Sequence, residues 1–118
     1  MLIEPPITRV GTPPERTRNE LLAIVALCEF ALSGAPRPTD EDLGLIGLEP
    51  DQIAEPASLA VRRWARIFSR TVAELRQLAE DLSDPRTARR WTGDDQKRVD
   101  HATAAVLDGL RTWLEVPD

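Results

Sequence analysis

The sequence predicts an all-α fold, a small bundle of three long helices over about 13–33, 56–82 and 93–115. Three observations lead to this prediction. Apolar residues recur every three or four positions along each segment, which is the spacing of one helix face. Start and stop signals bound each segment. No stretch alternates between apolar and polar residues in the manner of a half-buried strand. Short helical insertions are expected near 40–54 and 85–91.

The first long helix is expected to begin after Thr12, which can cap it, with Pro13 at the first helical position. Gly34 supplies a stop at the other end. The second half of this segment, LLAIVALCEFAL, is apolar nearly all round. Because such a helix needs neighbours on every side, we expect it to be the central helix of the bundle.

Residues 35–57 form an acidic connector, which contains six acidic residues and a single basic one, Arg37. Thr39 can cap a short helix there, and Gly44 and Gly47 limit its length. Five apolar side chains of the connector are expected to pack onto the bundle: Leu43, Leu45, Ile46, Leu48 and Ile53.

The second long helix has the clearest pattern. Pro56 or Ser58 begins it, and the sequence SDP at 83–85 ends it. Apolar residues step by three and four without a break, so we expect one continuous helix. At about 100° per residue, one arc holds Val61, Trp64, Phe68, Thr71, Leu75, Leu78 and Leu82, with Ala60, Ile67, Val72 and Ala79 beside them.

Two further start signals follow. Asp84 and Pro85 begin the short helix over 85–91, and Thr92 with Asp95 resembles a capping box for the last long helix. The inner face of that last helix is predicted to hold Val99, Ala102, Val106, Leu107, Leu110, Trp113 and Leu114.

Length and composition indicate one globular domain. The chain has 118 residues, of which 42% are hydrophobic and 30% are charged, so extensive disorder is not expected. Residues 1–11 are rich in proline, and we expect them to form a flexible tail before a single helical-bundle domain over 12–118.

The chain is expected to be cytoplasmic. Its first residues, MLIEPPITRVG, lack the basic and apolar regions of a secretory signal, and the apolar run 21–32 is too short to span a bilayer. Cys28 is the single cysteine, so no intramolecular disulfide can form. Of fifteen basic residues only Lys97 is a lysine, a bias typical of a high-GC genome, and we expect a bacterium or its phage as the source.

No residue pattern predicts catalysis. His101 lies on the polar arc of the last helix, as a solvated side chain does. Cys28 lies in the most apolar run, where free cysteine is a small hydrophobe, and a nucleophile needs a base within reach. EF-hand spacing and a phosphate-binding glycine loop are both missing. We therefore expect a protein that is not an enzyme and that binds no metal, cofactor or small molecule.

The outward arc of the second long helix is the candidate interaction surface. The same face becomes acidic further along, and such polarised charge is typical of recognition. Trp91 either covers one end of the bundle or projects as an anchor. The candidate residues are Arg62, Arg63, Arg66, Arg70, Arg89, Arg90 and Trp91. We expect a protein partner or a homo-oligomer, and a role as a small accessory or assembly subunit.

A DNA-binding regulator is the second interpretation. The succession of short helix, glycine, short helix and arginine face over 39–70 resembles a helix–turn–helix. The charge opposes it, because the net charge is −5 and residues 1–60 hold ten acidic against four basic residues. Acidic side chains beside the arginines offset the counterion release that drives DNA binding. An enzyme without a recognisable motif ranks third.

Overall fold

The computed structural model describes residues 13–115, and within this range it is all-α, without a strand. The elements are α1 (Pro13–Ser33), α2 (Asp40–Leu45), the 3₁₀ helix η1 (Pro50–Gln52), α3 (Leu59–Ile67), α4 (Ser69–Leu82), α5 (Pro85–Arg89) and α6 (Gly93–Glu115). The predicted helical bundle is thereby confirmed. The predicted tail over 1–11 and the Thr12 cap lie outside the described residues.

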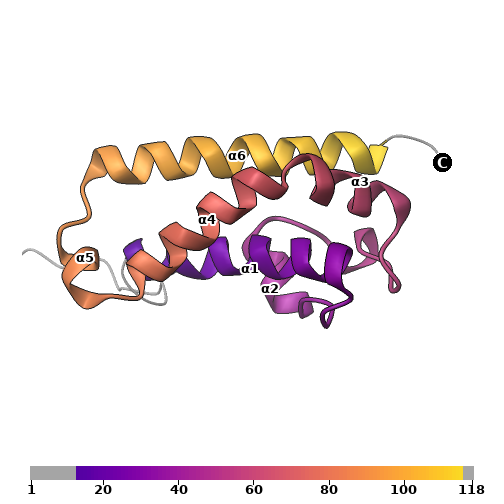
Figure 1. The fold of residues 1–118 in the computed structure, drawn as a ribbon, viewed down its shortest axis with the longest axis horizontal. Helices are drawn as coiled ribbons and strands as arrows, with labels where there is room; N and C mark the ends of the chain where they lie inside the picture. The colour runs from indigo at the N-terminus through magenta and orange to yellow at the C-terminus, as the bar shows by residue number, and fades with distance from the viewer. Residues whose placement is uncertain (1–12, 116–118) are drawn as a thin grey trace, which may run out of the picture.

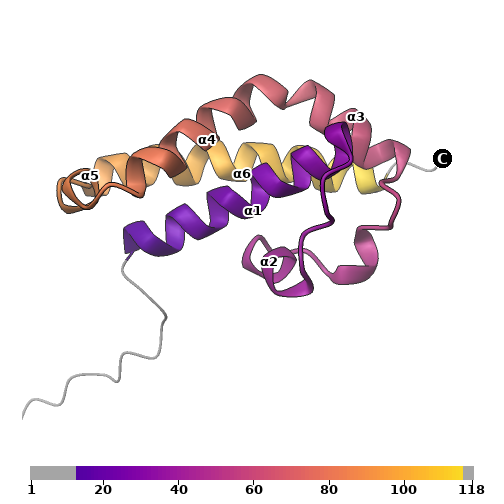
Figure 2. The ribbon, with the colours of Figure 1, turned by 60° about the horizontal axis from the view of Figure 1, so that its bottom comes forward.

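Helix α1 is not enclosed on every side as its composition predicts, because Leu22 and Leu32 are exposed and it is α3 and α4 that lie between α1 and α6. It packs against α4 along its length and against α2 and α3 near its C-terminal half, while α6 lies across the other faces of α3 and α4 (Figures 1 and 2). The side chains of Leu21, Ile24 and Leu27 are fully buried. Gly34 follows α1 with a positive φ of 71°, the backbone conformation that lets a helix stop there.

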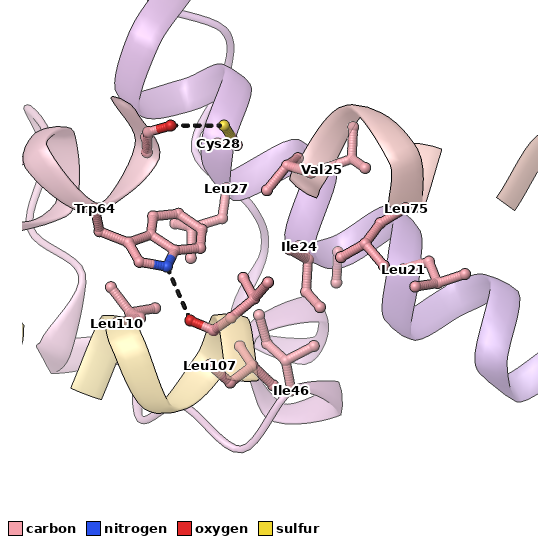
Figure 3. Close-up of a cluster of buried hydrophobic side chains, with 14 of the residues drawn as sticks. Leu21, Ile24, Val25, Leu27, Cys28, Ile46, Trp64, Leu75, Leu107 and Leu110 are labelled. Carbon is pink, nitrogen blue, oxygen red and sulfur yellow. Dashed lines mark hydrogen bonds between the residues drawn. The ribbon is translucent and has the colours of Figure 1, made fainter. Parts of the chain in front are cut away.

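The core is organised around Trp64 of α3. Its side chain is fully buried, and its indole Nε1–H donates a 3.0 Å hydrogen bond to the backbone carbonyl of Val106 in α6. In Figure 3 the ring lies between Leu27 of α1 and Leu110 of α6. Three helices therefore meet at this side chain. The hydrogen bond to Val106 satisfies the one polar atom that the tryptophan buries.

The segment predicted as one helix over 56–82 bends at Phe68 and forms α3 and α4. Phe68 has φ −97° and ψ 10°, although helical hydrogen bonds continue across it to Trp64 and Val72. The bend allows α3 to pack on α6 while α4 packs on α1 (Figure 1). The Phe68 ring lies directly over Gly109, where an added Cβ would come within 2.5 Å of two ring carbons.

The bend corrects one predicted core residue. Ile67 lies on the predicted inner arc, but its side chain is 59% exposed. The periodicity of a straight helix carries Ile67 toward the core, whereas α3 ends at this residue and turns it outward.

The connector is anchored by Arg37. Its guanidinium donates to the backbone carbonyls of Ile53 at 2.9 Å and Pro50 at 2.7 Å, and it pairs with Asp40 at 3.3 Å. Four of the five predicted apolar contacts are buried, namely Leu43, Ile46, Leu48 and Ile53. The fifth, Leu45, is 46% exposed, because the last turn of α2 directs it away from the core.

The predicted start signals act as caps. The hydroxyls of Thr39 and Ser58 accept hydrogen bonds from the N–H groups three residues on, and Asp84 caps α5. Thr92 and Asp95 form a reciprocal capping box, with bonds of 3.0 and 3.1 Å. The pKa of Asp95 is lowered, and the largest cause is the hydrogen bond that its carboxylate accepts from the Thr92 backbone N–H.

Candidate functional site

The outward side of α3 carries arginine and exposed aliphatic side chains together. Leu59 and Ile67 are 44% and 59% exposed, while the opposite side of the helix buries Val61, Trp64 and Ala65. The side chains of Arg62, Arg63 and Arg66 project from the same outward arc, and Arg70 follows just beyond the bend. We refer to Leu59, Arg62, Arg63, Arg66, Ile67 and Arg70 as the α3 face.

Three guanidinium groups of the α3 face have no partner in the described part of the chain. Arg62, Arg66 and Arg70 are exposed and form no ion pair or side-chain hydrogen bond with residues 13–115. Arg63 differs, because its guanidinium lies 5.8 Å from the centroid of the Trp113 ring in α6. This cation–π contact holds one edge of the face against the bundle.

The seven predicted surface residues form two separate groups. Arg89, Arg90 and Trp91 lie at the α5 end of the molecule, whereas the α3 face lies near the end of α6 (Figure 1). Trp91 is half-buried against the bundle, so it covers one end of the bundle rather than projecting from it as an anchor. Its ring lines a cavity of about 200 Å³ with Leu78 and Val99.

The side-chain amide of Gln96 links three parts of the fold. Its Oε1 accepts hydrogen bonds from Trp91 Nε1 at 2.8 Å and from Thr17 Oγ1 at 3.0 Å, and its Nε2 donates to Asp100 at 2.8 Å. Thr17 belongs to α1 and is only 4% exposed. This network was not foreseen from the sequence, because Thr17 and Gln96 are 79 positions apart.

A polar pocket of about 270 Å³ adjoins this network. It lies between α1 and α6 and contains the carboxyl groups of Glu20 and Asp100 together with Arg16. Burial, followed by the negative charge of Asp100, raises the pKa of Glu20, and Arg16 opposes this shift. The ionised form of Glu20 is therefore less favourable in this pocket than it is in water.

Cys28 and His101, the two residues considered for catalysis from the sequence, lie in different parts of the structure. Cys28 is buried, as predicted, and its thiol lies 3.8 Å from the Ala65 carbonyl oxygen (Figure 3). Burial raises the pKa of the Cys28 thiol. His101 is exposed on α6, again as predicted. Among residues 13–115, no three His, Cys, Asp or Glu side chains are placed to hold a metal ion.

A second exposed surface lies between α1 and α2. It is an open groove of about 470 Å³, into which Leu22 and Leu45 project, each 46% exposed. Asn19, Glu41 and Asp42 line the same groove. No side chain in the described range forms an ion pair with the carboxylates of Glu41 or Asp42. We call Asn19, Leu22, Glu41, Asp42 and Leu45 the acidic groove.

These features define an all-α bundle that presents a basic and apolar helix face and, separately, an acidic groove. None of its helices between residues 13 and 115 is long and apolar enough to cross a membrane. Comparison of the chain with protein-family models, with curated proteins and with solved structures gives no match. Function is therefore argued from the surfaces themselves.

Proposed function

We propose that the chain is a non-enzymatic protein–protein interaction module, a small accessory or assembly subunit of the cytoplasm, and that it docks through the α3 face. The observation that carries the proposal is the combination, on the outward side of α3 and the first turn of α4, of two exposed aliphatic side chains, Leu59 and Ile67, with three arginines that have no partner in the described range.

The composition of the α3 face supports a protein partner. Interfaces are enriched in arginine, which combines a planar donor group with an apolar stem, and their centres are apolar. Arg66 and Arg62 lie one helical turn apart beside Leu59. The expected partner surface therefore presents carboxylates around an apolar centre.

The α3 face is also held rigidly before binding. Ser58 caps the helix, the buried Trp64 fastens it to α6, and Arg63 contacts the Trp113 ring. A helix that is already ordered loses little conformational freedom when a partner binds, so more of the contact energy becomes affinity.

One observation favours DNA binding as the second candidate. Arg62 and Arg66 of α3 and Arg70 of α4 lie along one exposed side without an ion-pair partner in residues 13–115, an arrangement that phosphate-binding side chains also have. Exposed carboxylates at Asp40 and Glu41 in α2, within the connector that precedes α3, oppose this function. The experiment must therefore separate protein from nucleic-acid partners.

In-cell photo-crosslinking makes this separation. A photoreactive amino acid replaces Ile67 in the α3 face or, as the matched control, Ala104, which is exposed on α6. The proposal predicts a protein adduct, of any identity, from position 67 and none from position 104. Equal yields at both positions, or none at position 67, would contradict it. A nucleic-acid adduct from position 67 would make the regulator the better interpretation.

A further inference from the structure

The acidic groove and the α3 face have opposite charge and the same apolar content. The groove exposes Leu22 and Leu45 beside two carboxylates, and the face exposes Leu59 and Ile67 beside arginines. In the described range, five large hydrophobic side chains are exposed, and these two surfaces hold four of them. Exposed aliphatic side chains that gather on two charged surfaces mark docking sites rather than scattered surface residues.

One molecule cannot join its own two surfaces. Helix α2 lies on one side of α1, whereas α3 and α4 lie on the other side (Figure 2). Helix α1 therefore separates the acidic groove from the α3 face within a copy. A second copy has no such restriction.

We propose that the α3 face of one copy docks into the acidic groove of the next, so that the chain associates head to tail with itself. The inference rests on the proposed function and names the partner of its α3 face. Ile67 and Leu59 contact Leu22 and Leu45, while Arg62 and Arg66 pair with Glu41 and Asp42. Because the two contacting surfaces differ, such an interface leaves one free face and one free groove at the ends and produces a ring or an open chain.

The head-to-tail arrangement predicts a specific complementation. A variant with Arg62→Glu and Arg66→Glu keeps its groove, and a variant with Glu41→Arg and Asp42→Arg keeps its α3 face. Each variant alone lacks one half of every contact. Mixed together, they can form both contacts, because the unchanged face fits the unchanged groove and the reversed face fits the reversed groove.

Sedimentation of the purified full chain tests this prediction at concentrations up to about 1 mM, a range that detects weak contacts. We expect the wild type to form species larger than a dimer. Each variant alone should associate roughly 10- to 100-fold more weakly, since two ion pairs become repulsions. The equimolar mixture should again form species larger than a dimer, in which the two variants alternate. A chain that carries all four substitutions should associate again, because its charges are exchanged rather than lost.

Circular dichroism checks whether the variants keep their helices. Because Asp42 lies in the first turn of the short α2, a second pair avoids charge changes: Ile67→Ser disables the face and Leu45→Ser disables the groove. Both residues are exposed, so the fold does not depend on them. Each serine variant alone should be monomeric, and their mixture should form a 1:1 dimer and no larger species, because the two serine-bearing surfaces do not complement each other.

Each of the other outcomes contradicts a specific part of the self-association proposal. A wild type that is monomeric at about 1 mM excludes self-association, while the protein adduct at position 67 still tests the α3 face against a foreign partner. Association that only the α3 variant loses, and that neither mixture restores, excludes the groove as the docking site. Association that neither variant loses excludes both this inference and the α3 face as the self-association surface.

Discussion

At the level of single residues, the Gln96 side chain connects parts of the fold that lie far apart in the sequence. It accepts from Trp91 and Thr17 and donates to Asp100, so it joins α6 to α1 and to the segment after α5. The predicted pattern of apolar faces does not reveal such a residue, because helical periodicity locates buried arcs and not long-range polar partners.

Replacement of Gln96 by alanine should lower the free energy of unfolding by about 1–3 kcal/mol, because the Thr17 hydroxyl and the Trp91 N–H both lose their acceptor. Urea denaturation measures the loss. Gln77→Ala is the matched control, since that exposed amide bonds only to Asp81 on its own helix, and it should change stability by less than about 0.5 kcal/mol. Equal losses in both variants would show that Gln96 is not a structural link.

Glu20 should make stability depend on pH in the direction opposite to most carboxylates. Its raised pKa means that the folded state binds the proton more tightly, so its contribution is present at low pH and is lost as pH rises through the folded pKa. Glu20→Gln should therefore raise the melting temperature at pH 7 and leave it unchanged below the ordinary glutamate pKa of about 4.3.

Thermal unfolding at several pH values checks the Glu20 prediction. Glu74→Gln, on the exposed side of α4, is the control and should not reproduce the pH-dependent gain. A Glu20→Gln variant that is less stable than the wild type at pH 7 would mean that the carboxylate form is favoured in the pocket.

At the level of elements, the helix ends could be predicted and the bend could not. Thr39, Ser58, Asp84 and the Thr92–Asp95 box cap helices where local chemistry indicates them. The apolar steps, however, continue through Phe68, so the sequence pattern favours one straight helix. At the bend the Phe68 ring lies against Gly109, which is 41 positions away, so this contact is seen only in the folded chain.

Gly109→Ala tests how closely α3 and α6 meet. The added Cβ would approach the Phe68 ring to 2.5 Å, so we expect a loss of about 1–3 kcal/mol, even though alanine favours helix over glycine by up to about 1 kcal/mol. Gly44→Ala in α2 is the control, since its Cβ would meet open space, and it should be neutral or stabilising.

The coupling with Phe68 completes the test of the bend. In a Phe68→Ala background, Gly109→Ala should no longer cost stability, because the ring that the Cβ would meet is gone. Chemical denaturation of the single and double variants gives this coupling. If Gly109→Ala still lowers stability in the Phe68→Ala background, the loss has a cause other than contact with the Phe68 ring.

The candidate surface was predicted in part. The exposure of Arg62, Arg66 and Arg70 follows from their place on the outward arc, and the structure agrees. The exposure of Ile67 could not be foreseen, since apolar residues are assigned to a core by default. The acidic groove was also missed, because it forms between helices that only the tertiary fold brings together.

At the level of the whole molecule, the charge distribution predicts weak binding to duplex DNA. If all four arginines of the α3 face contacted phosphates, the salt slope would be about −3.6, and a fourfold rise in salt would weaken binding roughly 150-fold. The net charge of −5 reduces the affinity further. A gel shift with genomic fragments at about 150 mM salt should give no sequence-selective retention at submicromolar protein. Selective retention would favour the regulator.

The most direct test of the α3 face is the effect of charge reversal on the crosslink from position 67. Arg62→Glu with Arg66→Glu should lower the yield of the protein adduct at least about tenfold while helicity stays unchanged. Arg89→Glu with Arg90→Glu makes the same change in net charge at the α5 end and should preserve the yield. A yield that survives reversal in α3, or that is lost on reversal in α5, would contradict docking through the α3 face.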